Sequence, residues 1–246
     1  MKVLKNEQGS TLIMIMAILM ASIFMAFMFF DLFTTFANKR VSQTGADSGV
    51  LAAAKEARHA SREALLEEVV DRLEDLEEEI GDLLEDEEED FLADIDEEED
   101  PPEFDEEEYL ENIIDDLDIP DSIVDRLNDP TADIDFEEAL DFFFDDDGDV
   151  TAIACYGISN EWNEIEEAAI YFAVKNGAVH ESNNDIVVRF PYDNEFKIQV
   201  FTKRNPDYVT IDKEDVLNND IFAEAAADVG GIPGFEFMPS RCTGGM

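Results

Sequence analysis

Few residues in this sequence have the types and spacing that carry chemistry. The two histidines, His59 and His180, have no cysteine near them, so neither indicates a metal centre. Metalloprotease, nucleophile-elbow, Walker and dinucleotide-binding motifs do not occur in the sequence. Carboxylates are so numerous that their proximity says nothing about acid–base catalysis. We therefore expect a non-enzymatic protein with no catalytic residues, no cofactor and no small-molecule substrate.

The thiols are Cys155 and Cys242. Outside the cytoplasm an even pair of cysteines is typical of a disulfide. Closing this loop would stabilise the fold by about 4 to 5 kcal/mol in the chain-entropy model. The alternative is two unpaired thiols, one on a buried strand and one in the C-terminal tail.

The acidic stretch Asp145–Asp149 raises the question of calcium binding. An EF-hand loop needs oxygen ligands at its first and last positions around a central glycine. Aligning Gly148 with that glycine places Phe143 first and Ala154 last, so the motif fails. Weak binding of divalent cations remains an alternative to a simple polar turn before a strand.

Charge is distributed very unevenly along the 246 residues. The chain has 63 Asp and Glu against 16 Lys and Arg, a formal net charge of -47, and residues 63–149 contain 43 of the acidic residues but only two basic ones. Such a balance excludes general binding to nucleic acid and argues against docking on anionic lipid through a basic patch. The hydrophobic content of 45% is too high for a wholly disordered acidic chain.

An apolar run from Leu12 to Phe30 contains one polar residue, Ser22, and no charge. Its 19 residues would span roughly 28 Å as a helix, which matches the hydrocarbon core of a bilayer. A buried core helix would have a polar face, which this run lacks. A cleaved secretory signal has a shorter apolar region and a small-residue exit, whereas residues 31–36 continue this one. The pattern therefore predicts a transmembrane helix.

The orientation of this helix is not decided by its flanking charges. Lys2 and Lys5 precede the run, while Lys39 and Arg40 follow it. A membrane potential that is negative inside favours export of the acidic block. We therefore expect a single-pass protein of the cell membrane, with residues 1–11 as a cytoplasmic tail and the bulk of the chain extracytoplasmic.

The segment after the apolar run predicts a long helix with two kinds of packing surface. Small residues first favour close contact with a neighbouring helix: Ala46, Gly49, Ala53 and Ala57. A heptad seam follows: Leu66, Val69, Leu73, Leu76, Ile80 and Leu83. Because the charges beside the seam are acidic, two identical helices would repel each other. The seam is better suited to packing on its own chain or on another assembly component than to a homotypic coiled coil.

The rest of the chain predicts an α+β protein with five segments: the tail at 1–11, a transmembrane helix at 12–37, an amphipathic stalk helix at 38–95, an acidic segment with three short helices at 96–148, and a small α+β domain at 149–246. In that domain we expect a helix over 160–175 and a β-hairpin of 186–190 with 196–202. Residues 149–154 and 207–211 are predicted strands, and 221–228 is a short Ala-rich segment.

The order of features near the N-terminus resembles the TadE/TadG-like pilus-assembly proteins of the tight-adherence (Flp-type) type IV pilus family. These features are Asn6-Glu7-Gln8-Gly9-Ser10, the apolar run, Asp31, Lys39-Arg40 and the segment from Gln43 to Ala54. Two less specific matches to the family pattern are Tyr171–Gly177 and Phe222–Ala227. Together they cover less than half of the chain, and the acidic insert lies outside the common pattern.

The resemblance implies a minor-pilin-like component of a pilus or related secretion assembly, with pilin or pilus-assembly proteins as partners. It places a prepilin-type leader cleavage at the Gly9–Ser10 bond. Met14 occupies the position where prepilins usually carry Glu, which fits an uncleaved anchor better. Asp31 is expected either at the hydrated outer edge of the span or in an intramembrane salt bridge with a partner.

Two other classes of function fit the sequence. One is a membrane-tethered acidic binding module for divalent cations or a basic partner. The other is a secreted protein of a halophile, in which the charge serves solubility alone.

Overall fold

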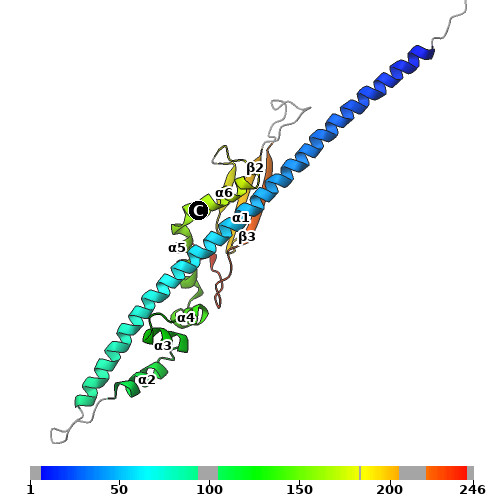
Figure 1. Ribbon diagram of the computed structural model, residues 1–246. Coiled ribbons are helices and arrows are strands. Elements are labelled where there is room, and N and C mark those ends of the chain that lie inside the picture. Colours follow the sequence, from blue (N-terminus) through cyan, green and yellow to red (C-terminus); the bar gives the residue numbers. More distant parts are fainter. Residues whose placement is uncertain (1–6, 94–104, 183, 205–219, 243–246) are drawn as a thin grey trace, which may run out of the picture. The chain divides into compact units, whose positions relative to one another are not determined.

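The computed structural model describes residues 7–93, 105–182, 184–204 and 220–242, and it is an α+β fold. Its first element is one continuous helix of 87 residues, α1 (Glu7–Ala93) (Figure 1). The chain forms two compact units, and α1 contributes to both of them. Its residues up to Ala54 belong to unit 1, and those from Lys55 onward belong to unit 2.

Unit 1 combines α1 with a helix and a three-stranded sheet. The helix is α6 (Trp162–Lys175), which belongs to unit 1 from Glu164 onward. The strands β1 (Ile186–Arg189), β2 (Lys197–Arg204) and β3 (Ile221–Asp228) lie in the order β1-β2-β3 (Figure 1). Strands β1 and β2 pair antiparallel, with Ile186 opposite Thr202 and Arg189 opposite Gln199.

The predicted hairpin is confirmed, and its turn has the expected chemistry. Asp193 and Asn194 have φ angles of 55° and 58°, a left-handed conformation that Asp and Asn tolerate better than most residues. The third strand, however, is β3, which was predicted only as an Ala-rich segment. The strand predicted at 207–211 lies outside the described residues.

Unit 2 combines the second part of α1 with four further helices: α2 (Glu106–Asp116), α3 (Asp121–Asn128), α4 (Phe136–Phe143) and α5 (Asp147–Asn160). Figure 1 shows α2, α3 and α4 lying alongside this part of α1. The short 3-10 helix η1 (Pro239–Arg241) also belongs to unit 2.

The middle of the hydrophobic seam of α1 is buried inside its own chain, whereas its last residue, Leu83, is 36% exposed. Val69, Leu73, Leu76 and Ile80 are at most 7% exposed. Leu66 is 40% exposed, however, and Leu65 takes its place in the core at 1%. From Arg72 on α1, Nη1 donates to the carbonyl oxygen of Phe143 at 2.8 Å, and the guanidinium lies 4.3 Å from the ring centroid of Phe144.

The predicted strand at 149–154 is wrong, because these residues lie within helix α5. Asp146 caps this helix, and its Oδ1 accepts hydrogen bonds from the backbone N–H groups of Gly148 at 2.7 Å and Asp149 at 3.1 Å. Acidic residues in the first turn further suit the positive end of the helix dipole. The acidic turn is therefore a helix start rather than a loop that leads into a strand.

Candidate functional site: an exposed apolar helix segment

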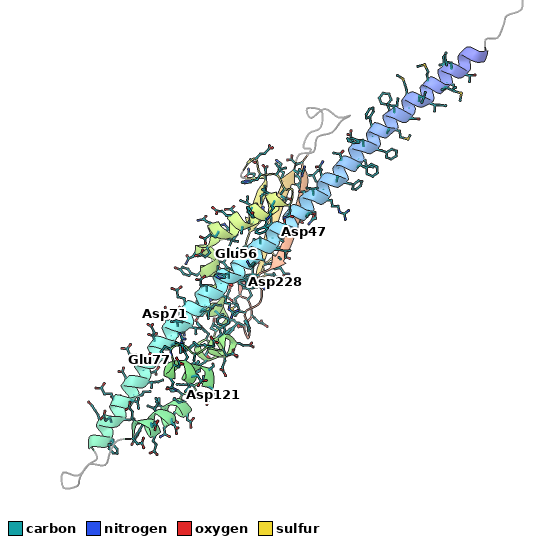
Figure 2. The ribbon with its side chains drawn as sticks, in the orientation of Figure 1. Asp47, Glu56, Asp71, Glu77, Asp121 and Asp228 are labelled. Atoms are coloured by element: carbon teal, nitrogen blue, oxygen red, sulfur yellow. A yellow bond between two sulfur atoms is a disulfide. The ribbon has the colours of Figure 1, made fainter. Side chains whose placement is uncertain are left out.

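The N-terminal part of α1 exposes large apolar side chains on every side. From Leu12 to Phe36 these side chains are between 44% and 72% exposed, and Figure 2 shows them projecting all around the helix. A soluble monomer rarely leaves so much contiguous apolar surface in water. Among the described residues, α1 is the one helix that is long and apolar enough to cross a membrane.

The hydroxyl groups of this segment bond within the helix. Ser22 Oγ donates to the carbonyl oxygen of Ile18 at 2.8 Å. Thr34 Oγ1 donates to Phe30 and Thr35 Oγ1 to Asp31, each at 3.0 Å. These contacts to the preceding turn satisfy polar atoms without water, as a hydrocarbon environment requires.

Asp31 differs from its surroundings because it is buried. Its exposed fraction is 6%, while the other described residues from 11 to 40 are exposed or half-buried. Both environments expected for Asp31, a hydrated edge of the span and a salt bridge with a partner, stay predictions. The bond between Gly9 and Ser10 lies inside α1, which begins at Glu7, and its cleavage stays a prediction.

Immediately after the apolar segment, α1 packs closely against the rest of unit 1. A Cβ atom added at Gly45 would lie 2.9 Å from Ala178 Cβ, and one added at Gly49 would lie 2.9 Å from the carbonyl oxygen of Ala169. Ser42 Oγ and Thr202 Oγ1 are 2.8 Å apart in a buried hydrogen bond. Glycine at these positions thus lets α6 and β2 approach the backbone of α1.

Strand β3 also contacts α1 at this level. Lys39 Nζ donates to the carbonyl oxygen of Phe222 at 2.6 Å. Gln43 Nε2 donates to the carbonyl oxygen of Glu224 at 3.0 Å. These side chains satisfy carbonyl groups of alternate β3 residues, so α1 covers part of the strand rather than leaving it available for pairing.

The electrostatics of this end of unit 1 are dominated by ion pairs and turns. Lys203 Nζ lies 2.7 Å from Asp220 Oδ2, and this hydrogen-bonded pair raises the pKa of Lys203. Asp185 accepts backbone hydrogen bonds from Ser182 and Glu181, and the first of these is the main cause of its lowered pKa.

The predicted site residues of the C-terminal half lie together in unit 2. Cys155 on α5 and Cys242 after η1 form a disulfide, with their Cα atoms 5.4 Å apart. Asp146 of the acidic turn caps α5, as described above. No group of three or more His, Cys, Asp or Glu side chains that could hold a metal ion occurs within the described parts of the chain.

Comparison of the chain with protein-family models, with curated proteins and with solved structures finds no match. The architecture and the local geometry described above are therefore the basis for a functional proposal.

Proposed function

We propose that this protein is a single-pass, membrane-anchored structural component of a surface assembly, similar to the TadE/TadG-like pilus-assembly proteins. The observation that carries the proposal is the exposed apolar segment from Leu12 to Phe36. In the same helix this segment is followed, without a break, by the residues that pack inside unit 1. A helix that is continuous from bilayer to folded unit can transmit position and force between them.

The proposed partners follow from the same surface. In the bilayer, the segment would pack with pilin-like or assembly proteins through apolar contacts. Outside the bilayer, the folded units would cap, prime or link a fibre. The tract from Asn6 to Ala54, with Gly9 and Asp31 in the family order, supports this class of assembly.

The anchoring is tested by placing two arginines in the segment. Each arginine near the centre of a transmembrane helix costs about 3 kcal/mol on insertion scales. We expect the double variant Leu19→Arg and Phe24→Arg to wash off membranes with alkaline carbonate, while the unmodified protein stays. Leu51→Arg with Val70→Arg is the matched control, because both residues are exposed on α1 beyond the segment. If carbonate extracts the unmodified protein, the segment variant and the control variant from membranes to the same extent, the anchor is contradicted.

The assembly role is tested by pull-down of the protein with its neighbours from the cells that make it, without crosslinking, at low and at high salt. Contacts between apolar helices should survive high salt. The N-terminal residue of the recovered protein then separates a processed pilin, which begins at Ser10, from an uncleaved anchor, which begins at Met1.

A second candidate function is an acidic binding module tethered to the membrane. It is favoured by the many exposed carboxylates of unit 2, of which Figure 2 labels Asp71, Glu77 and Asp121. Binding of a basic partner there would be screened by salt. If the proteins recovered with this chain at low salt are lost at high salt, that result would support the acidic binding module over the structural component of an assembly.

A further inference from the structure

We propose that the end of unit 1 beside the apolar segment is a basic collar that binds the anionic headgroups of the bilayer the segment spans. The collar consists of Lys39, Arg40, Lys175, Lys203 and Arg204. This inference rests on the proposed anchoring. It departs from the expectation, based on net charge, that no basic patch meets anionic lipid.

The collar residues come from three distant parts of the chain. Thr202 contacts Ser42, and Val200 lies near Gly49, so β2 runs toward the apolar segment and ends there with Lys203 and Arg204. Five of the 16 basic residues of a chain with net charge -47 thus gather at one end of unit 1.

Helix α6 reaches the same level. Ala169 and Ala173 contact the Gly49 position, whereas Gly177 contacts Val41, so α6 also runs toward the apolar segment and ends at Lys175. Arg204 Nη1 joins the two elements by donating to the carbonyl oxygen of Gly177 at 2.7 Å.

The height of the collar matches the headgroup layer. Lys39 and Arg40 follow Phe36, the last exposed phenylalanine of the segment, by three and four residues. At the helical rise this is about 5 to 6 Å, which is similar to the thickness of the headgroup region on one side of a bilayer.

Exposed aromatic rings accompany the basic groups. Phe222 is 46% exposed, stacks on Phe201 at 5.3 Å, and its carbonyl oxygen accepts from Lys39. Lys175 Nζ lies 5.5 Å from the ring centroid of Tyr171, which is 59% exposed. Aromatic rings beside cationic groups are typical of membrane–water interfaces.

Not all of the collar charge is available. The carboxylate of Asp220 pairs with Lys203, and Asp185 lies close enough to interact with the same ammonium. Lys39, Arg40 and Lys175 have exposed side chains, and no described carboxylate forms a salt bridge with them. These three residues are therefore the main headgroup ligands.

The test uses the full chain in nanodiscs of neutral phosphatidylcholine, with or without about one third phosphatidylglycerol. Phe222→Trp, in a Trp162→Phe background, reports contact through quenching by headgroup-labelled lipid. Each basic side chain near an anionic surface raises the ratio of lipid-bound to unbound protein surface by about fivefold. We expect the anionic lipid to increase quenching, and Arg40→Glu with Lys175→Glu to abolish that increase.

The matched control is Lys55→Glu with Arg189→Glu, which reverses two exposed charges outside the collar. It should retain the response to anionic lipid. If anionic lipid does not increase quenching, or if the increase is the same in the collar and control variants, the collar is overturned. The anchor is still supported in that case if the unmodified protein resists extraction by carbonate. Extraction of the unmodified protein by carbonate overturns the anchor, and the collar with it.

Discussion

The two compact units use the same helix in opposite ways. In unit 1, α1 supplies the small residues, because Gly45 and Gly49 allow α6 to approach its backbone. In unit 2, the glycine comes from the partner helix. A Cβ atom added at Gly157 of α5 would lie 2.5 Å from the carbonyl oxygen of Ala60 on α1. Close packing therefore depends on glycine in both units, whichever helix carries it.

The units also differ in how the contact continues along α1. The buried α1 residues of unit 1 are small, with Val50 the largest apolar one. In unit 2 the buried α1 residues beyond Ala60 are larger and include Leu65, Val69 and Leu73. Large side chains are needed there because α2, α3 and α4 are short and bury few residues of their own.

The largest difference between the units should appear on loss of the disulfide. It joins α5 to the C-terminal tail of unit 2 and closes a loop with a sequence separation of 87. In the chain-entropy model a loop of this length is worth about 4 kcal/mol, and Cys155→Ser destabilises unit 2 by up to that amount, because the part of the loop that folds in unit 1 is already constrained. Hydrogen exchange should show faster exchange in α5 and unchanged exchange in β2.

Cys242→Ser is the control for that experiment, because it opens the same bond without changing α5. The tail keeps two further contacts with α5: Met238 N–H donates to Thr151 Oγ1 at 3.1 Å, and Glu236 N–H donates to Asp147 Oδ1 at 3.0 Å. Loss of protection in β2 equal to that in α5 would mean that the two units unfold together.

Glycine substitutions should destabilise each unit separately and by a smaller amount. Gly157→Ala in unit 2 and Gly49→Ala in unit 1 each place a methyl group against a backbone oxygen. Overpacking of this kind costs about 1 to 3 kcal/mol, partly offset by up to about 1 kcal/mol of helix propensity. Urea unfolding followed by hydrogen exchange assigns the loss to the unit concerned.

Gly81→Ala is the matched control on α1. A Cβ atom at Gly81 meets nothing within 4 Å, so only the gain in helix propensity remains. This variant should stabilise unit 2 by up to about 1 kcal/mol. Destabilisation by Gly81→Ala, or none by Gly157→Ala, would contradict the role assigned to close packing.

Local patterns predicted much of this fold. Uniform apolarity predicted the exposed segment, and alternation with turn residues predicted the hairpin. The seam from Val69 to Ile80 was correctly identified as a packing surface, but Leu65 rather than Leu66 begins the buried stripe. Periodicity alone could not separate these two neighbours, because the partner helices decide which of them is covered.

The errors occurred where tertiary contacts outweigh local preference. The β-branched residues near Val150 favoured a strand, yet the Asp146 cap and the contact at Gly157 stabilise helix α5. Residues 221–228 were predicted only as an Ala-rich segment without a strand, yet pairing in the sheet makes them β3. The basic collar was not predicted, because its members are distant in sequence and meet only through the packing of α6 and β2 on α1.

The smallest expected effect compares one carboxylate from each unit. Asp185 in unit 1 accepts backbone hydrogen bonds from Ser182 and Glu181, and Asp129 in unit 2 accepts from the hydroxyl and N–H of Thr131. Both pKa values lie below the ordinary 3.8 because these bonds favour the ionised form. Each carboxylate therefore contributes stability that is present above pH 3.8 and is lost as the pH falls through the folded-state pKa.

Asp185→Asn should flatten the acid dependence of unit 1 alone, and Asp129→Asn that of unit 2 alone. The amide oxygen of asparagine can still accept the turn hydrogen bonds, but it does not titrate. The measurement is the urea midpoint of each unit between about pH 2.5 and pH 5, followed by hydrogen exchange. Because Asp129 is exposed and Asp185 is only half-buried, we expect shifts much smaller than those from the disulfide or the glycines. A change in both units from either variant would show that their acid stability is coupled.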